Sequence, residues 1–205
     1  MAFRLIYEGE LLSANAGDKT AVRKNKHAIR KQLHPQLKRL WQTDKHLHFH
    51  AIVPVQGIPI GGLPISNVFP TNLDYIAKKY ERCGNGFVPL IEPEGPLVNL
   101  YVSLDILFLR RERPGAIIKG GDLDNRMKTF FDGLKIPENC EDITEPFEVD
   151  ECPMYCLLCD DKLISEVKIT TDLMLRPASR SSRHDLNQVM LVVQVNVGRY
   201  GETWY

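Results

Sequence analysis

The stretch KGGDLDNRMKTFFDGLK, residues 119–135, decides how the rest of the chain is interpreted. Two glycines lead into two aspartates two residues apart, and an asparagine, a lysine and a third aspartate follow. Asp124, Lys128 and Asp132 recur every four residues and therefore share one face of a helix. A helix is predicted over 124–135 because apolar residues recur at helical spacing, at Met127, Phe130, Phe131 and Leu134.

A second acidic pair, Asp160 and Asp161, directly precedes a strand-like stretch at 163–175. If that strand lies beside the long alternating stretch VNLYVSLDILF at 98–108, the pair can approach the aspartates of the first stretch. Carboxylates held close together repel unless a cation neutralises them, and hard oxygen ligands select Mg²⁺ or Mn²⁺. A nearby lysine neutralises charge that develops on a reacting phosphate. Helix capping explains any single acid equally well, so both interpretations stay open on residue chemistry alone.

The remaining patterns predict an α/β (α+β) fold in one domain, residues 1–205. Further period-2 strands are expected near 3–11, 46–53 and 189–197. Five strands form a single mixed, largely antiparallel sheet with helices packed on it. Helices are predicted over 18–34, ended or kinked by Pro35, and over 72–83 behind Thr71. Residues 136–158 are interpreted as an acidic, cysteine-bearing insertion without regular structure.

Composition and charge narrow the class of protein. Hydrophobic residues make up 43% of the 205 residues and charged residues 25%, which is ordinary for a globular domain. No apolar run is long enough to cross a membrane, and the first residues do not resemble a signal peptide, so we expect a cytoplasmic protein. Five cysteines, an odd number, favour a reducing compartment over a disulfide framework.

The zero net charge hides a separation of charge along the chain. Residues 18–39 carry eight Lys/Arg and one acid, whereas residues 138–161 carry nine Asp/Glu and no Lys/Arg. A basic run of this kind either meets a phosphate backbone or forms a solvated helix face.

The sequence DLDNRMKTFFDGL, followed by CDDKLISEVKI, resembles the RusA-type Holliday junction resolvases. The family pattern is D-x-D-N, a lysine three residues after the Asn, Asp-(Ala/Gly)-Leu, and an Asp-Asp pair before a strand. The resemblance covers about residues 97–175. The segment between Asp132 and Asp160 differs from the family, because it is much longer than the usual short connection and is acidic.

The resemblance implies a homodimeric, Mg²⁺-dependent endonuclease that acts on branched DNA, with Mn²⁺ as a substitute ion. It assigns the metal-binding acids to Asp122, Asp124 and Asp161, and the catalytic lysine to Lys128. Three further residues of the pattern, Asn125, Asp132 and Asp160, would orient those groups. Asn125 is expected to fix the local chain by side-chain hydrogen bonds.

DNA phosphates are expected to meet two basic regions beside this centre. One is the first helix, through Arg23, Lys24, Lys26, Arg30 and Lys31; the other is the segment after the long strand, through Arg110, Arg111, Arg113 and Lys119. The alternating histidines His46, His48 and His50 are interpreted as polar residues of a strand face rather than metal ligands.

Four cysteines in the insertion offer an alternative metal site. Zn²⁺ binds four soft ligands in tetrahedral geometry, and the candidates are Cys140, Cys152, Cys156 and Cys159. The other interpretation is a set of small buried residues.

The sequence therefore predicts a Mg²⁺-dependent, structure-specific DNA endonuclease that resolves Holliday junctions or related branched DNA in recombination and repair. Two alternatives remain: a non-catalytic protein that binds branched DNA on the same fold, and a zinc-stabilised protein-interaction module.

Overall fold

The computed structural model describes residues 1–53, 71–93, 100–111, 122–175 and 187–199. The helices and strands, in chain order, are β1 (Ala2–Glu10), α1 (Lys19–Thr43), α2 (Lys45–Ile52), α4 (Asn72–Lys79), β2 (Phe87–Ile91), β3 (Leu100–Arg110), α5 (Asp122–Leu134), β4 (Met154–Leu158), β5 (Ile164–Leu173) and β6 (Gln188–Arg199). Short 3-10 turns follow α5, at η2 (Cys140–Asp142), η3 (Val149–Glu151) and η4 (Asp161–Leu163).

The main sheet has the strand order β1-β6-β3-β5. β6 pairs antiparallel with both β1 and β3, whereas β5 pairs parallel with β3. The predicted class, a mixed and largely antiparallel sheet with helices, is confirmed. The sheet has four strands rather than five, because residues 46–53 form a helix.

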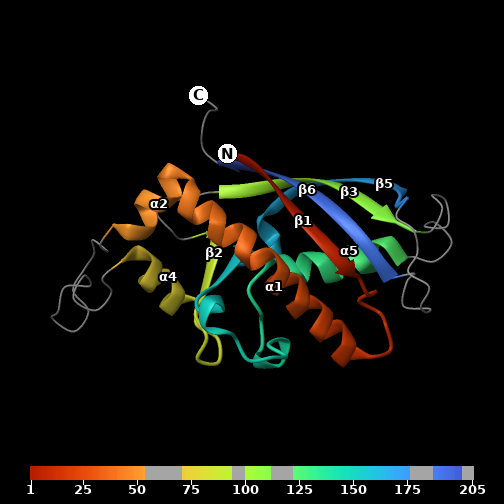
Figure 1. Cartoon of the computed structure of the whole chain (residues 1–205), viewed down its shortest axis with the longest axis horizontal. Helices are drawn as coiled ribbons and strands as arrows, with labels where there is room; N and C mark the ends of the chain where they lie inside the picture. The colour runs from red at the N-terminus through yellow and green to blue at the C-terminus, as the bar shows by residue number, and fades with distance from the viewer. Residues whose placement is uncertain (54–70, 94–99, 112–121, 176–186, 200–205) are drawn as a thin grey trace.

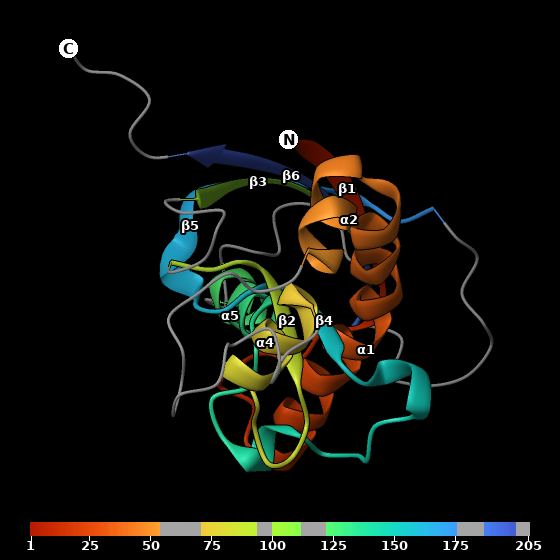
Figure 2. The same ribbon diagram turned by 90° about the vertical axis from the view of Figure 1, so that its left-hand side faces the viewer.

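One face of the main sheet carries the core. Alternate residues of the strands are buried toward the helices, among them Leu5, Ile106, Phe108, Leu191 and Val193. In Figure 2 the sheet is seen nearly edge-on, with α1, α4, α5 and the two-stranded sheet beneath it. Figure 1 shows α1 crossing in front of the sheet. Burial on one face only explains the period-2 alternation in the sequence.

The predicted strand at 46–53 is wrong, since this segment is α2. Asp44 caps the helix, because its side chain accepts hydrogen bonds from the amides of His46 and Leu47. Leu47 and Ala51, four residues apart, are the buried positions, so a helical period competes with the period-2 pattern and prevails. His46 and His48 are exposed, and His50 lies against the ring of Trp41 instead of on a strand face with them.

The first helix does not end at Pro35, because α1 continues to Thr43 with Pro35 inside it. Pro35 lies on the exposed side of the helix, whereas Leu33, Leu37 and Trp41 are buried around it. Packing of these side chains outweighs the lost backbone hydrogen bond. The helix predicted behind Thr71 is α4, capped by the Thr71 hydroxyl as expected, and it ends at Lys79.

A second, two-stranded sheet was not predicted. β2 and β4 pair in parallel, and every residue of both strands is buried. Parallel strands covered on both faces appear as short continuous apolar runs, which the sequence pattern does not distinguish from other buried segments. β4 lies within residues 136–158, so this region is part of the core and not an irregular insertion.

Two glutamines of α1 close one edge of the main sheet. The Gln36 side chain accepts from the amide of Ile6 at 2.9 Å and donates to its carbonyl at 2.7 Å. Gln32 bonds in the same way to the amide and carbonyl of Glu8, at 3.3 and 3.1 Å. Because β1 is an edge strand, these amides act as a substitute for a neighbouring strand.

We predict that Gly133→Ala destabilises the fold by about 1–2 kcal/mol, although alanine favours helix formation. A Cβ at Gly133 would lie 2.6 Å from Cγ2 of Ile29, so α1 and α5 would have to separate. Urea unfolding measures the change. Gly17→Ala is the control, since a Cβ there meets nothing within 4 Å. A Gly133→Ala protein as stable as the wild type would contradict the close helix contact.

We predict that stability falls as the pH drops below about 6.5, in part through the buried His34; burial also lowers the pKa of His27 and of His50, so the His34→Gln variant reduces the slope without removing it. Nδ1 of His34 accepts from the amide of Tyr155 at 2.9 Å, so protonation of Nδ1 breaks this bond. Burial lowers the pKa of His34, and Lys38 lowers it further, while the Asp150 carbonyl and Glu151 oppose them. The unfolded chain therefore binds the proton first, and the native state loses stability on acidification.

Urea unfolding at several pH values between about 7 and 5.5 tests this dependence. His34→Gln is expected to reduce the slope of the curve in this range, whereas His46→Gln, at an exposed position, leaves the curve unchanged. An unchanged slope in the His34 variant would rule out the assignment.

Candidate functional site

α5 carries the motif. Between the two parallel strands β3 and β5, the chain passes first through α5 and then through β4. Met127, Phe130 and Leu134 are buried beneath the sheet, as their spacing predicts. Asp124 and Lys128 are both exposed, one helical turn apart. The side chain of Asp122 lies outside the described part of the structure.

The first turns of α5 are held by the segment that precedes α1. The Asn125 side chain accepts from Nδ2 of Asn15 at 2.9 Å, and its carbonyl accepts from the amide of Ala14 at 3.0 Å. Arg126 donates to the side chain of Asn187, just before β6, at 3.2 Å. Asn125 therefore fixes the chain by hydrogen bonds, but it joins two distant segments rather than a local turn.

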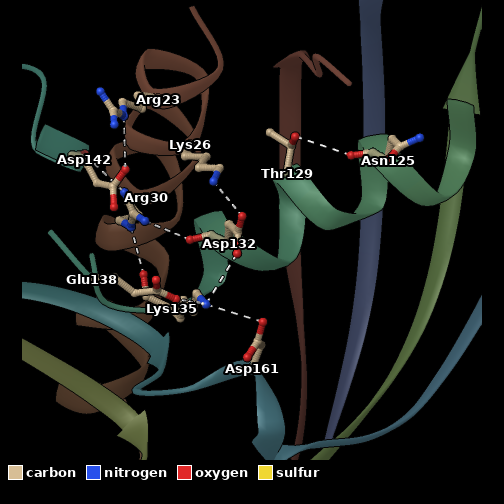
Figure 3. A network of polar contacts seen from close by, with 10 residues as sticks. All are labelled: Arg23, Lys26, Arg30, Asn125, Thr129, Asp132, Lys135, Glu138, Asp142 and Asp161. Atoms are coloured by element: carbon tan, nitrogen blue, oxygen red, sulfur yellow. Dashed lines mark hydrogen bonds and ion pairs between the residues drawn. The ribbon is translucent and has the colours of Figure 1, made fainter. Parts of the chain in front are cut away.

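At its other end, α5 contributes to a compact ion-pair network (Figure 3). The buried ammonium of Lys135 lies 3.4 Å from Asp132, 2.6 Å from Glu138 and 3.4 Å from Asp161. Asp132 also pairs with Lys26 of α1 at 2.6 Å. Burial acts to lower the pKa of Lys135, but the hydrogen bond to Glu138 and the charges of Asp132 and Asp161 raise it overall. Lys135 is therefore a fixed cation.

Arg30 of α1 satisfies the backbone at the same junction. Its guanidinium donates to the carbonyls of Lys135 and Asp132, each at 2.8 Å, and to that of Asp142 at 3.4 Å. The last carbonyls of a helix have no partner within the helix, so this buried cation caps the end of α5. A cavity of about 50 Å³ remains between Lys26, Arg30 and the acids, which has room for water but not for a nucleotide.

Asp161 and Asp132 both pair with Lys135 at the end of α5, whereas Asp124 lies near the start of that helix. Asp132 lies eight residues after Asp124, which is about 12 Å along the helix axis. The predicted neighbourhood of β3 and β5 is confirmed, but the two strands are parallel. The residues before β5 therefore lie at the start of β3, whereas α5 begins after the end of β3. Asp160 caps η4, and its hydrogen bond from the Lys162 amide lowers the pKa of the Asp160 carboxyl.

The basic residues of α1 are largely engaged. Arg23 pairs with Glu141 at 2.5 Å, Lys31 pairs with Glu151 at 3.2 Å, and Lys24 is exposed. Of the other predicted phosphate-binding residues, Arg110 is buried and Arg111 is half-buried, while positions 113 and 119 lie outside the described residues.

The four-cysteine zinc site is not formed. Cys140 is bound to Cys83 in a disulfide, whereas the odd number of cysteines had favoured a reducing compartment over a disulfide framework. Burial raises the pKa of the Cys156 thiol to about 12 and that of Cys159 to about 11, and this disfavours the thiolates that zinc needs. Cys152 is exposed.

Within the part of the chain that the structure describes, no three His, Cys, Asp or Glu side chains group in a way that could hold a metal ion. No helix there is long and apolar enough to cross a membrane. Comparisons with family models, curated proteins and solved structures gave no match.

Lys135 is the site residue that the sequence interpretation missed. A signal was present, because Asp132, Lys135 and Glu138 are spaced by three, which suits ion pairs near a helix end. The contribution of Asp161, 26 residues further on, has no local signal.

We predict that Lys135→Met lowers the free energy of unfolding by about 1–3 kcal/mol, because it leaves the partly buried Asp132 with one cation fewer. Glu138 and Asp161 are exposed enough to be solvated, which limits the loss. Lys162→Met is the control, since Lys162 is 87% exposed. Urea denaturation compares the two. Equal stability of both variants would show that the network contributes little.

Proposed function

We propose that this protein is a Mg²⁺-dependent, structure-specific endonuclease of the RusA type that cuts branched DNA such as Holliday junctions. The observation that carries the proposal is the D-x-D-N-x-x-K motif at the start of α5, where Asp124 and Lys128 are both exposed one turn apart. Because α5 connects two parallel strands of the sheet, the positions of Asp124 and Lys128 relative to each other are fixed. The resemblance in sequence supports the reaction class.

The donor set suits the proposed ion. Carboxylates such as Asp124 are the hard oxygen ligands that Mg²⁺ and Mn²⁺ prefer, and Asp122 would add a second. The bound ion would activate water and stabilise the leaving oxygen of the phosphodiester. Lys128 would neutralise the charge that develops on the phosphate in the transition state. Lys24 and Arg111 would hold flanking phosphates.

Asp161 has a separate place in this proposal. Within one subunit it pairs with Lys135, at the end of α5 away from Asp124. It would join the other two acids only as Asp161 of the partner subunit in the proposed homodimer. Otherwise the metal would be held by Asp122 and Asp124 alone.

That separation favours a second candidate, a non-catalytic protein that binds branched DNA on the same fold. Such a protein would bind a four-way junction with steep salt dependence, yet form no product during long incubation with Mg²⁺ or Mn²⁺. Product formation by the wild-type protein excludes this candidate. We place both candidates in the cytoplasm.

For the endonuclease, we predict that Asp124→Asn and Lys128→Met each lower cleavage of a labelled four-way junction about 100-fold, without loss of stability. Both positions are exposed, so the fold does not depend on them. Cleavage is measured in Mg²⁺ on denaturing gels, and stability by urea unfolding.

Glu166→Gln and Lys45→Met, at exposed positions away from the start of α5, are the matched controls and keep wild-type rates. Wild-type cleavage by Asp124→Asn would remove that residue from the proposed centre.

A further inference from the structure

The acidic segment, residues 138–151, lies along the basic helix α1. Glu141 and Asp142 lie 2.5 and 4.0 Å from Arg23, and Glu145 and Glu151 lie 3.8 and 3.2 Å from Lys31. Further along, Lys38 donates to the carbonyl of Asp150 at 2.6 Å. From Arg23 to Lys38 the helix advances about 22 Å. A row of carboxylates thus follows a row of cations.

Two of the cations in this contact, Arg23 and Lys31, are among the residues expected to meet DNA. A phosphate backbone binds through cations that replace its counterions, and Arg23 and Lys31 already have carboxylates as counterions. The acidic segment therefore occupies the position that a DNA strand would take on α1. The same ion pairs direct the paired carboxylates of the acidic segment toward α1 instead of toward an approaching phosphate.

The first part of the segment is held by a disulfide and by aromatic contacts, in addition to the hydrogen bond from Arg30 to the Asp142 carbonyl and the Lys135–Glu138 ion pair. At one end, the Cys83–Cys140 disulfide joins η2 to the turn after α4, 57 residues earlier in the chain. At the other end, Phe147 stacks on His27 at 5.7 Å and meets Phe87 edge-on at 5.6 Å. Between them, Glu141 and Glu145 remain 67% and 61% exposed. The groove of about 400 Å³ beside Lys24, Lys31 and Glu145 shows that this part is not packed into the core.

We propose that residues 138–146 mask the DNA-binding face of α1, and that reduction of the Cys83–Cys140 disulfide releases the mask. This inference rests on the proposed DNA-binding function. A dithiol is the reductant. Its first thiolate attacks one sulfur of the disulfide, which forms a mixed disulfide with that cysteine and releases the other cysteine. The second thiol of the reductant then displaces the cysteine that remains in the mixed disulfide. Two electrons and two protons pass to Cys83 and Cys140, and the dithiol becomes a cyclic disulfide.

The energetics fit a releasable contact. An exposed ion pair such as Arg23–Glu141 contributes little to stability, so its carboxylate yields to a phosphate backbone with many charges. Both cysteines of the disulfide are exposed and accessible to a thiol. Disulfides in the cytoplasm, where we place this protein, are commonly transient or redox-sensing, which agrees with a regulatory bond.

The experiment compares oxidised and dithiol-treated protein in binding a labelled four-way junction without divalent ions, over a series of salt concentrations. We expect about three- to tenfold tighter binding after reduction, and a salt dependence steeper by about 1 for each released cation. Cys140→Ser reproduces the reduced state without dithiol, whereas Cys152→Ser, an exposed free cysteine of the same region, does not. Arg23→Ala removes most of the difference, and Arg39→Ala, elsewhere on α1, retains it.

Amide hydrogen exchange provides a readout that does not involve DNA. Exchange at Asp142 and Ile143, whose amides are bonded within η2, is expected to accelerate on reduction. Unchanged exchange overturns the release, and faster exchange with unchanged DNA affinity overturns the masking. If exchange accelerates but neither form binds any DNA, the proposed function fails while the release itself stands.

Discussion

The contact between the middle of α1 and the end of α5 is the constraint on which the rest of the structure depends. A helix end leaves carbonyls without partners, and here two of them belong to the half-buried Asp132 and the buried Lys135. The fork of donors on Arg30 satisfies two of them and also holds the backbone of η2. The absence of a side chain at Gly133 lets the two helices approach closely. The position of α5 under the sheet, and hence of Asp124 and Lys128, follows from this contact.

The separation of charge along the sequence is resolved in space by the same arrangement. The basic helix and the acidic segment lie against each other, so the molecule presents neither as an open patch over its whole length. The Arg23–Glu141 pair is exposed and stabilises the fold little, whereas the Lys31–Glu151 pair is more buried. Their main effect is positional, because they determine which charges face solvent.

The sequence predicted the parts of the fold whose burial is one-sided. β3, β6 and α5 show clean periodicity because one face of each meets the core. α2 was missed because its buried residues, Leu47 and Ala51, fit both a period of two and a helical period, and because its cap, Asp44, was not recognised. β2 and β4 were missed because burial on both faces removes the alternation. For the site, the exposure of Lys128 follows from helical spacing, but the position of Asp161 depends on strand direction, which no local pattern encodes.

Closure of β1 by Gln32 and Gln36 makes the main sheet asymmetric. In the main sheet, β5 is the other edge strand, and the two glutamines lie at β1 and not at β5. An incoming extended peptide would therefore continue the hydrogen-bond ladder at β5 rather than at β1. Charged side chains along that border, including Glu166 and Lys168, make indiscriminate self-association there unfavourable.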